Sequence, residues 1–121
     1  MALKEIASEM RQYAIDNPRI SSAADIRPYR RTLAGGLRVV LFVGVDHVWH
    51  LSAYRLGVLP SRKEIEILKR DFDVPAEAKE QTVAIPGDVP PEQQWRIVRL
   101  RWVETEQVPL FEVGPAPAKY Y

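Results

Sequence analysis

Three polar side chains alternate along one predicted strand and could form a recognition surface or an acid catalyst. His50, Ser52 and Tyr54 occupy every second position, and apolar residues fill the positions between them. Because successive side chains of a strand point to opposite faces, these three share one face. A histidine there can titrate near neutral pH and act as a general acid. The alternative is the polar side of a half-exposed strand, which needs no function.

A second candidate surface lies in the segment WRIVRLRWVE, residues 95–104. Strand alternation places Arg99 and Arg101 on one face, and Leu100 and Trp102 on the other. Arginines interleaved with aromatic rings can contact phosphates and stack on bases, which would make a nucleic-acid surface. The alternative is a solvated strand face whose tryptophans belong partly to the core.

A third candidate is a small basic patch in the segment RPYRR, residues 27–31. Arg30 and Arg31 end this segment, Arg38 follows closely, and Asp25 lies just before it. Such a patch can bind phosphate or an acidic protein surface. A solvated connector has the same composition, so the sequence leaves both interpretations open.

The sequence lacks the residues that several kinds of chemistry require. The chain has no cysteine, which excludes disulfides, thiolate nucleophiles and cysteine-ligated metals. It contains no glycine-rich phosphate loop, HExxH, GxSxG or paired acidic motif. His47 and His50 are three residues apart, but no third ligand has a suitable spacing. We therefore expect no cofactor, no metal ion and no assembled catalytic site.

Length and composition predict one ordinary globular domain. The chain has 121 residues, 46% of them hydrophobic, and a formal net charge of +1, so no strong overall field draws it to nucleic acid or acidic membranes. Its longest apolar run, Val39–Val45, is too short to cross a bilayer. The charged N-terminus lacks a signal-type apolar segment. We expect a cytoplasmic protein with no membrane partner.

The pattern of apolar residues predicts two helices. Residues 3–16 form an apolar face with Arg11 pointing outward, and Asn17-Pro18 ends this helix; the face consists of Leu3, Ile6, Ala7, Met10, Tyr13 and Ala14. Residues 61–72 form a second helix, which Ser61 and Glu64 open as a capping box.

Between and after these helices the sequence predicts a small antiparallel sheet of three or four strands. Residues 18–36 read as a connector, and residues 37–56 as a central hairpin whose first strand is buried on both faces. Residues 81–85 and 95–104 supply later strands. The predicted fold is thus a single α+β domain over residues 1–108, followed by a proline-rich C-terminal tail over residues 109–121.

Two stretches of the chain resemble a family of small phage and prophage proteins of unknown function. The first is the strand Trp49-His50-Leu51-Ser52, similar to the W-x-H-x-S strand of that family, which leads through a P-[ST]-x-x-E turn into a K-x-x-F helix, together residues 49–72. The second combines proline-containing residues 85–91 with Leu100-Arg101-Trp102. The chain departs from this family in lacking a histidine before the paired prolines and an asparagine-bearing loop. The resemblance implies a mobile-element origin and no particular activity.

The hairpin followed by the helix that opens at residues 60–65 is also similar to the RelE/HigB-type toxin fold. That resemblance implies cleavage of translated mRNA by basic and aromatic residues on the sheet. The chain lacks the lysine-rich turn of those toxins, and its first helix and last strand are not in their usual order.

These observations favour a non-enzymatic accessory or interaction protein that binds a protein partner through its surface. The alternatives are a nucleic-acid-binding protein that uses the arginine and tryptophan strand, and a RelE-like ribonuclease toxin. The sequence leaves the identity of the partner and the oligomeric state open.

Overall fold

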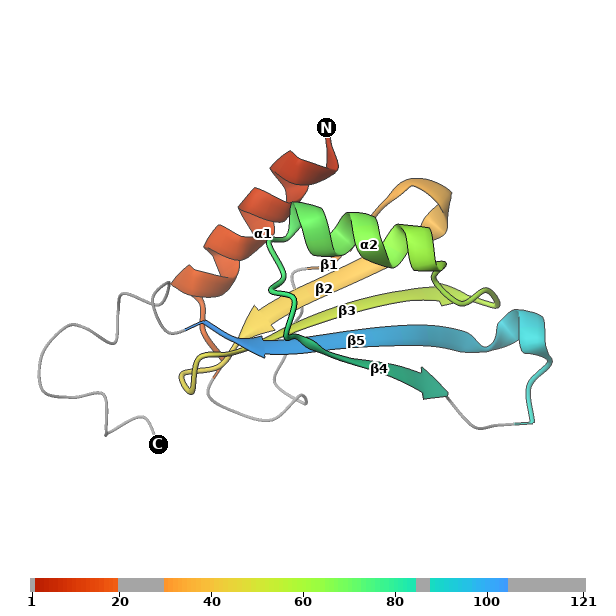
Figure 1. The fold of residues 1–121 in the computed structure, drawn as a ribbon. Coiled ribbons are helices and arrows are strands. Elements are labelled where there is room, and N and C mark those ends of the chain that lie inside the picture. The colour runs from red at the N-terminus through yellow and green to blue at the C-terminus, as the bar shows by residue number, and fades with distance from the viewer. Residues whose placement is uncertain (1, 20–29, 85–87, 105–121) are drawn as a thin grey trace, which may run out of the picture.

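In the part of the chain that the structure describes, the protein has two helices and a five-stranded antiparallel sheet in the order β1-β2-β3-β5-β4. The computed structural model describes residues 2–19, 30–84 and 88–104. Both helices lie on the same face of the sheet (Figure 1). The elements are α1 (Leu3–Asp16), β1 (Arg30–Thr32), β2 (Arg38–Val43), β3 (Val48–Leu56), α2 (Arg62–Asp71), β4 (Lys79–Ala84) and β5 (Trp95–Val103), with short 3-10 turns η2 (Ala34–Gly36) and η3 (Pro91–Gln93).

The predicted α+β class is confirmed, but the sheet has five strands where three or four were expected. The additional strand, β1, lies within the segment predicted to be a connector. Its sequence is Arg-Arg-Thr, so it has no apolar alternation that could reveal it. The tail predicted over residues 109–121 lies outside the described residues. No helix in the described part of the chain is long and apolar enough to cross a membrane.

The central hairpin pairs β2 with β3, as predicted. Val39, Leu41 and Val43 of β2 are buried, whereas the alternate residues of this strand are only half-buried. The prediction that this strand is buried on both faces is therefore wrong. The reason is topological: both helices cover one face of the sheet, and no described element covers the other.

Helix α1 begins and ends where the sequence predicts, but its buried face is rotated. Ala7, Met10 and Ala14 are buried, as expected, and Tyr13 is 38% exposed although it was assigned to the apolar face. Arg11 was expected to point outward and is instead 8% exposed. A polar side chain this deep needs hydrogen-bonding partners, because burying an unpaired charge is costly.

The partners of Arg11 join three elements of the fold. Its guanidinium donates to the carbonyl oxygen of Phe72 at the end of α2 (2.9 Å) and to Oε1 of Glu104 after β5 (2.7 Å). It also lies over the ring of Trp49, 4.5 Å from the centroid. The other oxygen of Glu104 accepts from Nε1 of Trp102 at 2.5 Å. This Arg11 cluster ties α1, α2 and the end of β5 around two buried tryptophans.

The predicted capping box of α2 is present, and it is also an ion-pair site. Oγ of Ser61 accepts from the backbone N–H of Glu64 (3.1 Å), and the Glu64 carboxylate accepts from the backbone N–H of Ser61 (2.9 Å). Arg55 of β3 donates to both oxygens of Glu64 at 2.8 Å. The helix start is thereby fixed to the sheet, with Ile65, Leu68 and Phe72 buried beneath it.

Replacing Arg11 with methionine should lower the free energy of unfolding by about 3–5 kcal/mol, because the Glu104 carboxylate would be left buried without its cation. Denaturant unfolding measures this loss, and Lys63→Met is the control, since Lys63 is exposed on α2. Combining Arg11→Met with Glu104→Gln should cost less than the sum of the two single changes. Equal losses for Arg11→Met and Lys63→Met would contradict this account of the cluster.

Acid should weaken the contact between α2 and the sheet. Hydrogen bonds from Arg55 hold the pKa of Glu64 at about 2, below its ordinary 4.5. Between these two pKa values the unfolded state therefore binds more protons than the folded state. The contribution of Glu64 to the free energy of unfolding is complete above pH 4.5 and is lost as the pH falls toward 2. Glu64→Gln keeps the acceptor for Ser61 but removes the charge, and the pH dependence of thermal unfolding should flatten in that variant. An unchanged pH dependence would exclude Glu64 as a source of it.

Candidate functional site

The two candidate strand surfaces predicted from the sequence are a single surface. His50 is paired directly with Arg101 across β3 and β5, and Ser52 is paired directly with Arg99. Directly paired residues of antiparallel strands point to the same face. These side chains lie on the face away from the helices, because the residues between them on β3 are buried beneath α1 and α2.

We call this surface the open face and define it by strand register. Each of its residues is exposed or half-buried. Across the sheet it comprises Arg30 and Thr32 of β1; Arg38, Val40 and Phe42 of β2; Val48, His50, Ser52, Tyr54 and Leu56 of β3; Trp95, Ile97, Arg99, Arg101 and Val103 of β5; and Lys79, Gln81 and Val83 of β4.

The open face carries cations without acidic neighbours in the sheet. Its five cations are Arg30, Arg38, Lys79, Arg99 and Arg101, and no carboxylate occupies any strand position of this face. Two described acids lie beyond one end of these strands: Asp46 in the β2–β3 turn, and Glu77 beside a hollow of about 390 Å³ that Lys79 and Arg101 also line. The surface is therefore strongly positive although the whole chain has a net charge of +1.

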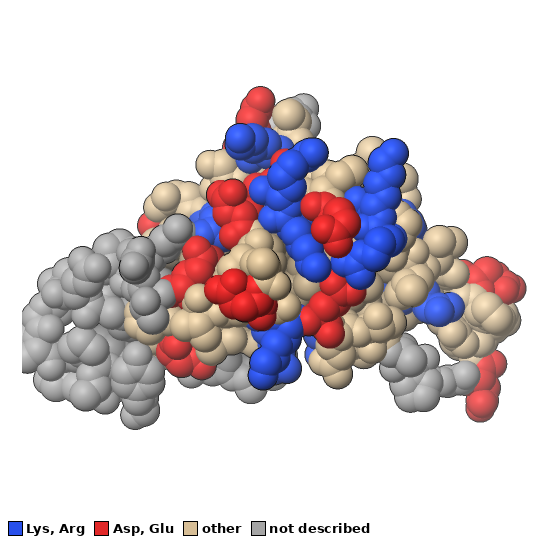
Figure 2. Space-filling model, in the orientation of Figure 1, with Lys and Arg blue, Asp and Glu red and all other residues tan. Residues whose placement is uncertain are grey.

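On the opposite side, glutamates of the sheet and of the helices are paired with arginines. Glu80 of β4 accepts from Arg62 of α2 at 2.7 Å, and Glu9 of α1 accepts from Arg31 of β1 at 3.2 Å. Figure 2 shows the result over the helices, where Lys and Arg side chains intermingle with Asp and Glu. The basic patch predicted at residues 27–31 is thus divided. Arg30 lies on the open face, Arg31 lies on the helix side, and residues 27–29 are outside the described ranges.

Aromatic rings stand among the cations of the open face. Phe42 and His50 stack in parallel, with centroids 4.5 Å apart and an interplanar angle of 8°. Tyr54 and Trp95 meet edge to face at 5.6 Å, and the guanidinium of Arg38 lies 5.1 Å from the centroid of the Trp95 ring. These contacts hold planar groups in fixed orientations beside positive charge.

The environment of His50 favours its neutral form. Its partial burial lowers its pKa below 6.5, and the positive charge of Arg101 lowers it further. Asp46 raises the pKa by less than these, and Arg99 lowers it by the smallest amount. A neutral imidazole can accept or donate one hydrogen bond and can stack as an uncharged ring.

Among the charged and aromatic members of this surface, sequence reasoning missed two, Phe42 and Lys79. Phe42 was assigned to a strand buried on both faces, and Lys79 precedes the predicted strand at residues 81–85. The register of the predicted hairpin was the available signal for Phe42, because it places this ring opposite His50. The sequence offers no comparable signal for Lys79, since β4 is mostly polar.

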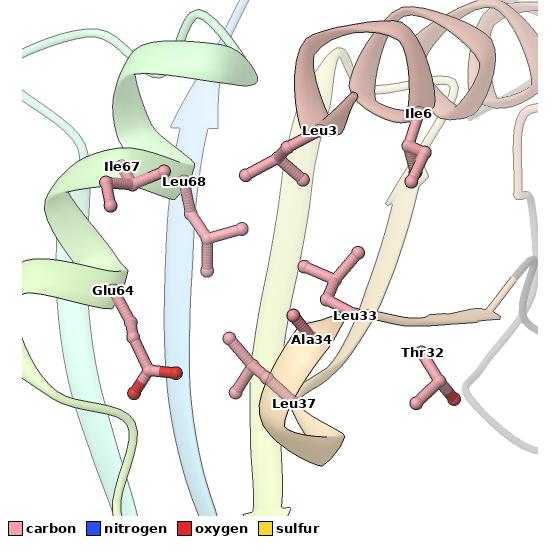
Figure 3. Close-up of a pocket in the computed structure, with 9 residues that line it drawn as sticks. All are labelled: Leu3, Ile6, Thr32, Leu33, Ala34, Leu37, Glu64, Ile67 and Leu68. Carbon is pink, nitrogen blue, oxygen red and sulfur yellow. The ribbon is translucent and has the colours of Figure 1, made fainter. Parts of the chain in front are cut away.

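A second candidate site lies on the helix side, between the two helices and η2 (Figure 3). This pocket of about 390 Å³ is lined mainly by apolar side chains, among them Leu3, Ile6, Leu33, Leu37 and Ile67. Its carboxylate, Glu64, is already bound by Arg55. The pocket could hold an apolar group but offers little polar chemistry to select one.

Among the described residues, no three His, Asp or Glu side chains are grouped as a metal ion would require. No protein-family model, no curated protein and no solved structure matches the sequence or the fold. The geometry of the open face is therefore the basis for inferring a function.

We expect His50 to titrate below pH 6.5 in the folded protein. Nuclear magnetic resonance of its imidazole proton measures the midpoint, and His47→Asn identifies the signal while tolerating the positive backbone φ of 67° at that position. In Arg101→Gln the midpoint should rise but stay below 6.5, because burial is the larger cause of the shift. Arg70→Gln, on the helix side, should leave the midpoint unchanged. A midpoint at or above 6.5 in the unaltered protein would be incompatible with this environment.

The same shift predicts a dependence of stability on pH. The folded-state pKa of His50 lies below its unfolded value of 6.5, so the unfolded state binds more protons between the two. The contribution of His50 to the free energy of unfolding is complete above pH 6.5 and is lost as the pH falls below 6.5.

Proposed function

We propose that this protein is a non-enzymatic binding protein that holds an anionic partner on its open face. The observation that carries the proposal is the presence of five cations without a carboxylate on one sheet face of a chain whose net charge is only +1. Placing like charges together on one surface costs free energy in the isolated protein, and an anionic partner would offset that cost.

Support also comes from the contrast between the two sides of the sheet. On the helix side, Arg31, Arg55 and Arg62 each pair with a glutamate. On the open face, Arg30 donates to the hydroxyl of Tyr54 and the guanidinium of Arg38 lies over the ring of Trp95, both of which are neutral groups. A guanidinium bound in this way keeps its charge available to a partner.

The functions implied by the sequence resemblances stay predictions. A mobile-element origin fits a small binding protein, but the open face does not depend on it. The ribonuclease activity implied by the RelE/HigB resemblance would require His50 or Arg99 to act on RNA, and incubation with labelled RNA tests it directly.

Charge reversal on the open face should abolish polyanion binding. We expect the unaltered protein to be retained on a heparin column, and Arg99→Glu/Arg101→Glu to elute at much lower salt, because both side chains are exposed on this surface. Lys4→Glu/Lys63→Glu is the matched control, since it makes the same change in net charge at exposed positions of α1 and α2. Equal shifts in the two variants would indicate that net charge alone governs retention, and would refute the proposed surface. Thermal unfolding of each variant confirms that it is folded.

A further inference from the structure

We propose that the anionic partner is single-stranded nucleic acid, bound across the open face with its phosphates at the cations and its bases stacked on the aromatic rings. This inference rests on the proposed function and specifies its partner. It uses two properties of the open face together: the arrangement of the charges and the orientation of the rings.

The charges are spaced to follow an extended anionic chain. Arg99 and Arg101 are two residues apart on β5, which places them about 7 Å apart along the strand. Lys79 is paired with Arg101 on the neighbouring strand, and Arg38 and Arg30 lie on strands beyond β3. The cations thus extend across the whole width of the sheet, as a polymer with a charge at every repeat would require.

The aromatic rings of the open face can stack on planar groups, which a surface that binds anions by charge alone does not require. The parallel stack of Phe42 and His50 can be extended by a third planar ring, and a nucleobase has the size and flatness to do so. The neutral state of His50 favours this role, since an uncharged imidazole stacks without a charge to solvate. Trp95, held by Tyr54 and Arg38, forms a second aromatic group at the other end of β3.

These two aromatic groups distinguish single-stranded nucleic acid from other anionic partners. The bases of a duplex are stacked on each other and cannot lie on protein rings, so a duplex would use the cations alone. An acidic protein segment would also use the cations, with no general need for stacked rings. The observed combination of five cations with two ring groups favours unpaired bases.

The test is fluorescence anisotropy with four labelled probes: a 12-nucleotide single-stranded DNA, the RNA of the same length, a DNA duplex and poly-glutamate. We expect both single strands to bind more tightly than the duplex and poly-glutamate. If all five cations contact phosphates, affinity should fall about 100-fold between 50 and 200 mM salt. Arg99→Glu/Arg101→Glu should remove binding, and Lys4→Glu/Lys63→Glu should retain it.

Substitution of the rings decides between stacking and charge alone. Trp95→Leu and Phe42→Leu keep an apolar side chain of β-compatible size, and each should weaken single-strand binding by about 5- to 150-fold while leaving poly-glutamate binding unchanged. If one of the two variants fails to fold, the other still tests stacking, and circular dichroism shows which variants are folded. Recovery of the RNA probe at full length after the assay shows binding without cleavage.

The outcomes distinguish this inference from the proposed function. Binding of poly-glutamate or duplex as tightly as single strands, with no effect of the ring variants, would overturn the single-strand partner while the anionic open face stood. If no probe bound and heparin retention did not depend on Arg99 and Arg101, the proposed function would fail as well. Shortening of the RNA probe that requires His50 would replace both with a ribonuclease.

Discussion

The buried guanidinium of Arg11 fixes the arrangement on which the rest of the structure depends. It reaches the last carbonyl of α2 through Phe72 and the end of β5 through Glu104, so both helices are held against the same face of the sheet. A buried ion pair is not in itself a source of large stability, because desolvation offsets the Coulomb attraction. Its effect is on geometry, since the guanidinium is satisfied only when these three elements meet.

One consequence of this arrangement is the unequal distribution of charge between the two sides of the sheet. On the covered side, Glu9 of α1, Glu64 of α2 and Glu80 of β4 pair with arginines from the strands or from α2. The strand positions of the opposite face receive arginine and lysine without such partners in the sheet. A net charge near zero therefore coexists with a cationic surface, because the neutralising carboxylates lie on the other side.

The sequence predicted the elements with strong local patterns and missed those without them. The capping box of Ser61 and Glu64 and the Asn17-Pro18 stop are local signals, and both helices were found to within one residue. Strand β1 is short and polar, and it exists because β2 offers an edge to pair with. The burial of Arg11 also could not be predicted, since its partners Phe72 and Glu104 are 61 and 93 residues away. Polar residues whose role is set by distant partners have no periodic signature.

The candidate site shows the same division between local pattern and tertiary context. Alternation along each strand correctly grouped His50 with Ser52 and Tyr54, and Arg99 with Arg101. Alternation within a strand does not specify which strand lies beside it, so the pairing of β3 with β5, which merges the two groups, had no sequence signal. That pairing also changes what can be inferred from each group. Arginines alone would be compatible with any anionic partner, and aromatic rings alone would be compatible with burial in a hydrophobic core. Only together, on a face that the helices leave uncovered, do they describe a surface suited to a charged polymer with planar side groups.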